Sequence, residues 1–295
     1  MKNRPLILSG KDVSLDVYKS LKLRIQSLSK KGVFPGLAVV LVGENPASRV
    51  YVNSKTKTFK KLSIHSKTFT LPVDVTSKDL LDLIKSLNKN HLYHGILVQL
   101  PLPGHINAQD VINSISPEKD VDGFHPQNAG LLSIGKPRFI PCTPKGIMRI
   151  LNFYNLDLNG KHIVVIGRSN IVGRPVSILC SQKISGANGT VTICHSGSKN
   201  ISDFTLTADI IIVALGVPNY LKSHMVKDDS VIIDVGINRI SSEESKKGYK
   251  LIGDADFTNL SNNVSAITPV PGGVGPMTIA MLVENTIEAA ETTLN

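Results

Sequence analysis

Hydrophobic residues in the first half of the chain change between two spacings. Over residues 11–31 they recur every three or four positions until Gly32, and the same spacing returns over 80–87, so both segments are predicted helices. Thr76 and Asp79 resemble a capping box ahead of the second helix. Short apolar runs alternate with the helices, at 37–42, 67–71 (weaker) and 95–100. This alternation predicts strands buried in parallel βαβ units.

The second half repeats the alternation from a new start. Its apolar runs lie at 161–166, 190–194, 209–215 and 231–235. Helical segments are predicted between most of them, and a last helix runs through Ile287. A further helix, opened by Thr143-Pro144 as N-cap and first helical residue, links the two halves. The predicted fold class is α/β, with a domain boundary between Pro141 and Asn159.

Composition restricts the class of protein. An apolar share of 41% and a charged share of 19% in 295 residues suit a globular protein of one large or two ordinary domains. No apolar run reaches the ~18 residues of a membrane span, and the first residues lack the apolar stretch of a secretory signal. The three cysteines never form a Cys-x-x-Cys pair, which argues against disulfides and against zinc. We therefore predict a cytosolic protein without a metal.

The net charge of +10 is concentrated at one end of the chain. Up to Lys61 there are 13 Lys and Arg against three Asp and Glu, whereas the remaining 20 basic and 20 acidic residues cancel. A basic end attracts either nucleic acid or a polyanionic small substrate. Aromatic residues make up only 5% of the chain, and no usual nucleic-acid motif is present, so nucleic-acid binding is the minor alternative.

A helix opened by Asn45-Pro46 carries the first candidate chemistry. Tyr51 and Lys55 stand one turn apart on it and share a face. A phenol beside a buried amine is a reasonable acid/base pair. Since several lysines follow closely, a solvated basic helix is the alternative, and this stretch alone favours it, so other parts of the chain have to decide.

Polar residues at the end of the 95–100 run add to this candidate site. Ligands of parallel sheets bind beyond the carboxyl ends of the strands, which is where Gln99 lies. Asp120 and Asp122 follow in a loop rich in turn formers, where capping and turn bonds are the alternative to catalysis. His125 precedes a proline, which favours a structural role.

A glycine loop follows the first strand of the second half. Gly167 and Gly173 enclose it ahead of a helix, an arrangement typical of phosphate binding at a helix N-terminus. The spacing Gly-x5-Gly departs from the usual G-x-G-x-x-G, so tight turns in a generic α/β domain remain an alternative. The next strand ends at His195-Ser196 without the carboxylate typical of NAD sites, and Arg168 with a hydroxyl suits a 2′-phosphate. The sequence therefore favours NADP over NAD.

The last loop before the final helix contains three prolines and three glycines within 267–277. This composition predicts a rigid loop whose backbone approaches another group closely, and an elaborate turn is the alternative.

Seven short stretches occur in order along nearly the whole chain: Tyr51-Val-x-x-Lys55, Val98-Gln-Leu-Pro-Leu-Pro103, Lys119-Asp-Val-Asp-Gly-Phe124, Pro141-Cys-Thr-Pro144, Val165-Ile-Gly-Arg-Ser169 with Ile171-Val-Gly173, Asp234-Val-Gly-Ile-Asn238, and Pro269-Val-Pro-Gly-Gly-Val-Gly-Pro-Met-Thr278. Together they closely resemble the bifunctional methylenetetrahydrofolate dehydrogenase / methenyltetrahydrofolate cyclohydrolase family. The first and last stretches are highly specific to it. Ser63 departs from the family, which usually has glycine there, and this puts the shape of that turn in doubt.

The resemblance implies two α/β domains with a cleft between them. Residues 1–146, completed by the C-terminal helix 274–295, would form the folate-binding catalytic domain, and 147–273 a Rossmann-type NADP-binding domain. Such enzymes oxidise methylene-tetrahydrofolate to methenyl-tetrahydrofolate with NADP and then hydrolyse it to formyl-tetrahydrofolate. The family also implies a homodimer formed through the Rossmann half.

The resemblance also implies roles for individual residues. Lys55 would be the general acid/base of the hydrolytic step, and Gln99 would tune its protonation. Tyr51 would stack on the folate, and Asp122 would bind the pterin edge. Further folate contacts would come from Pro271, Gly272 and Gly273. Contacts to the dinucleotide would come from Gly167, Arg168, Ser169, Ser196 and Ile237.

Three other readings compete with this function. The chain could be a dehydrogenase that lacks the hydrolytic activity, a nucleic-acid-binding protein that uses its basic end, or an idle nucleotide-binding sensor. Lys55 with Gln99 favours retention of both activities, and the intact Lys55, Gln99 and Asp122 argue against the sensor.

Overall fold

The computed structural model describes residues 4–242, 245 and 248–294, so the first three residues, considered above for a secretory signal, lie outside the described part. The chain divides into two compact units, each built from two separate stretches. The small-sheet unit comprises Val17–Cys142 and the described residues from Ile279 onward. The large-sheet unit comprises the described residues up to Asp16 together with Thr143–Thr278. Compactness does not show which unit binds which ligand, so the boundaries 1–146, 147–273 and 274–295 stay a prediction.

The small-sheet unit is built on a parallel sheet whose strands lie in the order β3 (His65–Leu71), β2 (Gly36–Val42) and β4 (Gly95–Val98). Strands β2 and β4 are buried along their whole length, as their unbroken apolar runs predict. The helices of the unit are α1 (Gly10–Lys30, from residue 17 on), α2 (Pro46–Lys61), α3 (Ser77–Lys89), α4 (Ala108–Ser114), α5 (Pro126–Ser133) and α10 (Val274–Glu291, from residue 279 on), followed by the short helix η2 (Thr292–Leu294).

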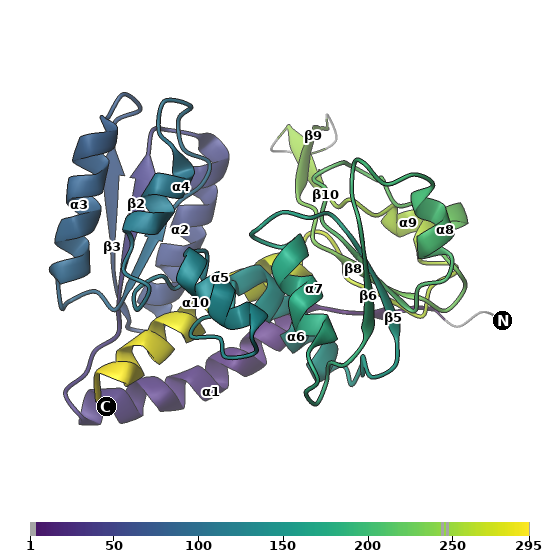
Figure 1. Cartoon of the computed structure of the whole chain (residues 1–295), viewed down its shortest axis with the longest axis horizontal. Helices are drawn as coiled ribbons and strands as arrows, with labels where there is room; N and C mark the ends of the chain where they lie inside the picture. Colours follow the sequence, from purple (N-terminus) through teal and green to yellow (C-terminus); the bar gives the residue numbers. More distant parts are fainter. Residues whose placement is uncertain (1–3, 243–244, 246–247, 295) are drawn as a thin grey trace. The chain divides into compact units, whose positions relative to one another are not determined.

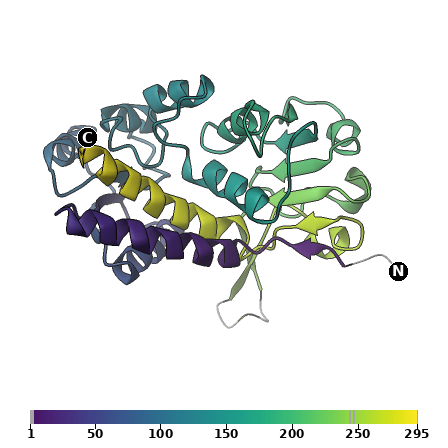
Figure 2. The same ribbon diagram turned by 90° about the horizontal axis from the view of Figure 1, so that it is seen from below.

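The helices of this unit begin where the sequence provides caps. The Asn45 carboxamide accepts a hydrogen bond from the Ser48 N–H at 3.1 Å, and the Thr76 hydroxyl accepts one from the Asp79 N–H at 3.1 Å. Both predicted caps are therefore confirmed. Helices α1 and α10 run side by side in both views (Figures 1 and 2), and Arg24 joins them through a paired hydrogen bond to Glu291 at 2.6 and 2.9 Å.

The large-sheet unit contains a six-stranded sheet whose neighbours all run parallel. Its spatial order is β1 (Leu6–Ile7), β11 (Ala266–Ile267), β8 (Val231–Asp234), β7 (Ile210–Val213), β5 (His162–Ile166) and β6 (Thr190–Cys194). From β5 the chain moves first outward to β6 and then back to β7 on the other side. The order therefore reverses between β5 and β7, which is the switch point at which doubly wound sheets bind ligands.

Short elements complete the large-sheet unit (Figure 1): α6 (Cys142–Phe153, from residue 143 on), α7 (Gly173–Ser181), α8 (Ile201–Thr205), η1 (Ser223–Met225), α9 (Phe257–Leu260) and an antiparallel hairpin of β9 (Asn238–Ser241) and β10 (Tyr249–Ile252). Buried side chains from the sheet and from Leu221, Met225 and Leu260 form one apolar core.

The predicted opening of the linking helix is wrong by two positions. Helix α6 begins at Cys142, so Thr143 lies inside it and is not the N-cap. Its hydroxyl instead makes a 3.0 Å hydrogen bond with the Thr278 hydroxyl, and a tertiary contact thus replaces the local cap. The elements β1, β11, α5 and the β9–β10 hairpin were not predicted, because each is short or lacks a clear hydrophobic period.

Within the described residues, no helix is both long and apolar enough to cross a membrane. All three cysteines are buried and free.

Candidate active site

Helix α2 places Tyr51 and Lys55 one turn apart, as predicted. The Lys55 side chain is directed into the small-sheet unit, where the residue is only 8% exposed, and its ammonium donates a 3.1 Å hydrogen bond to Gln99 Oε1. The alternative of a fully solvated basic helix is therefore wrong for Lys55, whereas Lys57 and Lys60 of the same helix are exposed. Tyr51 is 38% exposed, and partial burial raises the pKa of its phenol.

The carboxyl end of β4 fixes Gln99. Its backbone N–H donates to the Val40 carbonyl at 2.9 Å, which continues the sheet pairing one residue beyond the strand. Its side-chain Nε2 donates to the Leu100 carbonyl at 2.8 Å. Since the amide nitrogen is occupied by the backbone, the amide oxygen is the atom presented to Lys55.

The two aspartates of the following loop have different environments. Asp120 is 2% exposed and accepts hydrogen bonds from the His125 N–H and the Asn128 side-chain amide, both at 2.8 Å. Burial raises the pKa of Asp120 to about 6, although these two hydrogen bonds act to lower it. His125 caps α5 through Nδ1, which accepts from the Gln127 N–H at 3.1 Å. Asp120 and His125 therefore shape the loop, as the structural alternative proposed.

Asp122 faces the lysine. Burial raises the pKa of its carboxyl, while the positive charge of Lys55 and a hydrogen bond from the Cys142 thiol oppose the rise. The structure thus brings Lys55, Gln99 and Asp122 together at one end of the small sheet. An ammonium bonded to an amide oxygen, with a carboxylate near enough to feel its charge, is suited to exchanging protons with a bound substrate.

Asn285, which no sequence pattern singled out, lies behind this loop. It is fully buried in α10, and its amide nitrogen donates to the carbonyls of Val121 at 2.7 Å and Ile140 at 3.0 Å, next to Cys142 Sγ at 3.7 Å. The available signal was a single amide side chain in a mostly apolar helix, although Glu284 and Thr286 flank it in the sequence.

In the large-sheet unit, the glycine loop follows β5 at the switch point. Gly167 has a φ of +127°, and a Cβ on it would overlap the carbonyl oxygen of Ala214, just after β7. A Cβ on Gly173 would overlap the carbonyl oxygen of Gly167. At both glycines of the Gly-x5-Gly spacing another backbone carbonyl lies so close that a side chain would not fit.

The loop is ordered by its own hydroxyl. Ser169 Oγ accepts hydrogen bonds from the N–H groups of Val172 at 3.2 Å and Gly173 at 3.4 Å. Arg168 is exposed, and within the described part of the chain its guanidinium has neither a hydrogen-bond nor an ion-pair partner. Ser196, just beyond β6, is also exposed. Because all the strands are parallel, these residues follow strand ends that lie on the same edge of the sheet.

Two further predicted contacts lie in this unit. Ile237 follows β8 and is 41% exposed. The Pro271–Gly273 loop follows β11 and is tied down by the Gly273 N–H to the Pro269 carbonyl at 2.8 Å and by the Lys11 N–H to the Gly272 carbonyl at 3.1 Å. This loop and Lys55 belong to different units, so their joint action on one substrate stays a prediction.

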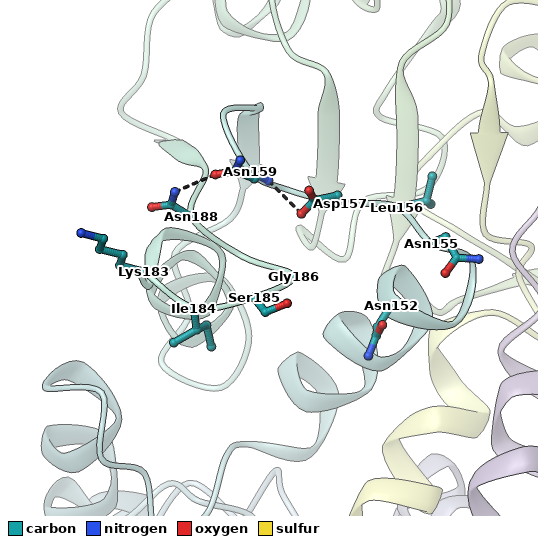
Figure 3. A pocket seen from close by; sticks show the side chains of 10 residues that line it. All are labelled: Asn152, Asn155, Leu156, Asp157, Asn159, Lys183, Ile184, Ser185, Gly186 and Asn188. Carbon is teal, nitrogen blue, oxygen red and sulfur yellow. Dashed lines mark hydrogen bonds between the residues drawn. The ribbon is translucent and has the colours of Figure 1, made fainter.

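A cavity of about 570 Å³ lies away from all of these residues (Figure 3). It is next to the amino ends of β5 and β6, opposite the glycine loop, and asparagines make up much of its wall. Asn155 and Asn188 adopt left-handed turns there, and Asn188 Nδ2 donates to Asn159 Oδ1 at 2.7 Å. Turn formation explains these amides, so volume alone does not mark this cavity as the active site.

The strand order and the glycine loop make the large-sheet unit a Rossmann-type nucleotide-binding fold. Comparison with protein families agrees with this class. Residues 141–294 match the NAD(P)-binding domain of tetrahydrofolate dehydrogenase/cyclohydrolase, and residues 8–122 match its catalytic domain. The chain therefore belongs to the tetrahydrofolate dehydrogenase/cyclohydrolase family.

Individual relatives are similar over nearly their whole length. The bifunctional protein FolD of Campylobacter hominis is 51% identical, over 98% of both chains. The crystal structure of the bifunctional FolD methylenetetrahydrofolate dehydrogenase/cyclohydrolase of Campylobacter jejuni is 48% identical, with a TM-score of 0.91 over 97% of this chain and 99% of that one. The Trypanosoma brucei FolD, complexed with NADP and an inhibitor, is 33% identical, with a TM-score of 0.94 over 99% of each chain.

These findings confirm four predictions: the family, the α/β fold class with two domains, the assignment as an enzyme, and a nicotinamide dinucleotide as cofactor. The exposed loop residues Arg168 and Ser169, with the buried Gly167 before them, fit such a cofactor, since a guanidinium and a hydroxyl beside a glycine turn suit a phosphate. No group of three or more His, Cys, Asp or Glu side chains suited to a metal occurs among the described residues.

Proposed function

We propose that this enzyme oxidises methylene-tetrahydrofolate to methenyl-tetrahydrofolate with NADP and then hydrolyses the product to formyl-tetrahydrofolate. The observation that carries the proposal is the buried Lys55 ammonium, bonded to Gln99 and close enough to Asp122 to affect its pKa. The relatives named bifunctional FolD, similar over nearly the whole chain, support the pairing of the two activities.

Lys55 is the proton carrier of the hydrolytic step in this proposal. As an amine it accepts a proton from the water that adds to the methenyl carbon. As an ammonium it donates a proton to the ring nitrogen that leaves that carbon, and the second proton of the water is lost to solvent. Gln99 holds the ammonium through the 3.1 Å hydrogen bond, and the positive charge of Lys55 opposes the rise in the pKa of Asp122.

The remaining residues of the proposed folate site position the substrate. The half-exposed Tyr51 ring offers a flat face for stacking on the pterin. The Asp122 carboxylate accepts hydrogen bonds from the pterin amino and ring N–H groups. We also propose folate contacts from Pro271, Gly272 and Gly273. We further propose a folate domain formed by residues 1–146 with 274–295 and a dinucleotide domain formed by 147–273.

The dehydrogenase step requires mainly orientation from the chain. The bound dinucleotide supplies the hydride acceptor. Gly167 and Ser169 shape the loop that would receive its phosphates, and Ile237 would contact the dinucleotide. Arg168 and Ser196, both exposed on the same edge of the sheet, bind a 2′-phosphate, which makes NADP the preferred cofactor.

Replacing Lys55 tests the bifunctional proposal. In Lys55→Met, hydrolysis of methenyl-tetrahydrofolate is expected to fall by about 10²–10⁴-fold, the usual contribution of a general acid/base. NADP reduction should persist, so methenyl absorbance accumulates together with reduced cofactor. Lys57→Met is the matched control, because Lys57 is exposed on the same helix. Unchanged hydrolysis in Lys55→Met would leave a dehydrogenase whose hydrolytic activity is absent or depends on another group.

Replacing Arg168 tests the cofactor preference. Arg168→Ala is expected to weaken NADP binding about tenfold or more and to leave NAD binding nearly unchanged, since only NADP carries the 2′-phosphate. Arg174→Ala is the control, because this arginine is bonded to Asn170 Oδ1 at 2.9 Å. An equal loss of binding affinity for NADP and for NAD in Arg168→Ala would reject the proposed contact.

We also propose that the chain is a cytoplasmic homodimer that assembles through the large-sheet unit and does not bind nucleic acid. Light scattering of the purified protein tests the dimer, and a monomer at micromolar concentration would reject it. Salt-sensitive retention on DNA or RNA would revive the alternative suggested by the basic end of the chain.

A further inference from the structure

The large-sheet unit contains two buried carboxylates that the proposed chemistry does not use. Asp234 ends β8 and is 2% exposed, and Asp254 follows β10 and is fully buried. Neither carboxylate has a cationic partner among the described residues. Buried charges without a counter-ion require dense hydrogen bonding, and both groups have it.

Six hydrogen bonds surround the pair. Asp254 accepts from the N–H groups of Leu215 at 2.6 Å and Gly216 at 2.8 Å and from the side-chain amide of Asn238 at 2.8 Å. Asp234 accepts from the N–H groups of Gly236, Asp254 and Ala255, each at 2.9 Å. The backbone of one aspartate thus donates to the side chain of the other. We call this pair, with its donors, the aspartate clamp.

Two glycines make room for the clamp. A Cβ on Gly253 would overlap Asp234 Oδ2, and a Cβ on Gly236 would overlap Asp254 Oδ1. Both carboxylates therefore lie directly against backbone, where no larger residue fits. Burial raises the pKa of Asp234 to about 6, so at neutral pH its side chain is an anion that accepts from all three donors.

The clamp acts on the ligand edge of the sheet. Leu215 and Gly216 follow β7, next to the switch point, and a Cβ on Gly167 of the glycine loop would meet Ala214 immediately before them. Gly236 and Asn238 flank Ile237 on both sides. One carboxylate, Asp254, therefore holds the turn after β7 and, through Asn238, the segment that presents Ile237.

We propose that Asp254, oriented by Asp234, is a positioning residue for the dinucleotide: it fixes the loop after β7 and the Ile237 segment in the form that binds the cofactor. This inference rests on the proposed function only for the identity of the ligand. The pair acts through backbone N–H groups and the Asn238 side chain, so its role is positioning rather than chemistry.

Cofactor affinity and the two activities give separate readouts. In Asp254→Ala, the dissociation constant for NADP, measured by calorimetric titration, is expected to rise about 10–100-fold, the range for losing a contact that orients a binding group. The dehydrogenase KM for NADP should rise with it, while the KM for folate stays within about twofold. Hydrolysis of supplied methenyl-tetrahydrofolate needs no dinucleotide and should be retained, which a globally misfolded chain would not show.

Asp254→Asn is the conservative variant. Its amide oxygen accepts from Leu215 and Gly216, and its amide nitrogen donates to Asn238 after that side chain flips, so NADP affinity should stay within about threefold of wild type. Asp256→Asn is the matched control, because Asp256 is bonded to Lys222 and Asn259 rather than to the ligand edge. If Asp254→Ala does not fold, Asn238→Ala tests the same link and should weaken NADP binding at least fivefold.

Wild-type NADP affinity in both Asp254→Ala and Asn238→Ala would overturn the proposal. Equal loss of NADP binding and of hydrolysis in a folded Asp254→Ala would also overturn it, because the pair would then support the whole chain. If the wild-type protein binds NADP but does not oxidise methylene-tetrahydrofolate, the proposed function fails. The NADP affinities of the Asp254 and Asn238 variants still test the clamp.

Discussion

Replacing the buried amide of Asn285 should weaken the small-sheet unit. Its Nδ2 is the donor for two backbone carbonyls, those of Val121 at 2.7 Å and Ile140 at 3.0 Å. In Asn285→Leu, a side chain of similar size has no donor, and both carbonyls lose this bond. Val121 keeps a weak donor, the Cys142 thiol at 3.4 Å.

The size of the effect follows from these contacts. A buried carbonyl left without a donor costs about 1–3 kcal/mol, with Val121 near the low end because the thiol remains. The sum is a loss of about 2–4 kcal/mol in the free energy of unfolding, or roughly 5–10 °C in Tm. Val121 immediately precedes Asp122, so the KM for methylene-tetrahydrofolate should rise as well, while NADP affinity stays unchanged.

A second substitution at this position provides a distinctive signature. In Asn285→Asp, a neutral carboxyl can still donate one O–H, whereas a carboxylate would face two carbonyl oxygens. Folding therefore raises the pKa of the introduced carboxyl above its unfolded value. The variant binds more protons folded than unfolded, so its stability relative to wild type should fall as the pH rises from about 4 through the folded pKa.

Urea unfolding followed by circular dichroism at pH 5.5 and 8 measures both effects. Asn113→Leu and Asn113→Asp, on the exposed face of α4, are the controls and should change stability by less than about 0.5 kcal/mol. A loss below about 1 kcal/mol in Asn285→Leu, or a pH-independent loss in Asn285→Asp, would refute the reasoning.

Three further outcomes are expected. Ser63 has a φ of +57°, so Ser63→Gly should raise the free energy of unfolding by about 0.5–1 kcal/mol, and a decrease in Tm would contradict this. The pKa of Asp120 is about 6 in the fold against 3.8 unfolded, so the folded state binds more protons between these values. Its contribution to stability should therefore fall by up to about 3 kcal/mol as the pH rises from 4 to 6, and Asp120→Asn should remove this slope in urea titrations at several pH values. In Gly173→Ala, the added Cβ overlaps the Gly167 carbonyl, so NADP affinity should drop about tenfold or more, whereas Gly130→Ala, with open space around it, should bind NADP normally.

Local patterns predicted the framework of both units. Apolar runs identified β2, β4 and β5. Asparagine followed by proline identified the cap of α2, and threonine ahead of a helical period identified the cap of α3. The position of Gln99 at a strand end also placed it correctly beside Lys55. These features depend on neighbours in the sequence or on rules that hold for every parallel sheet.

Features that depend on distant contacts could not be predicted. Strand β1 is two residues long and forms only by pairing with β11, some 260 positions away. Asp234 and Asp254 look like ordinary turn residues until the fold buries both against backbone N–H groups. Asp120 and Asp122 are two residues apart but have different surroundings. The Asn128 amide donates a hydrogen bond to Asp120, whereas the charge of Lys55 acts on Asp122.

The interleaving of the two units has a consequence for synthesis on the ribosome. The small-sheet unit needs the residues after Ile279, and the large-sheet unit needs both the start of the chain and Thr278. Neither unit can be completed while the last stretch of the chain is still inside the exit tunnel. The nascent protein must therefore hold two partly assembled units until the residues from Ile279 onward have left the tunnel. A single cut of the gene after the codon for Cys142 would yield two fragments that each lack a piece of their own unit.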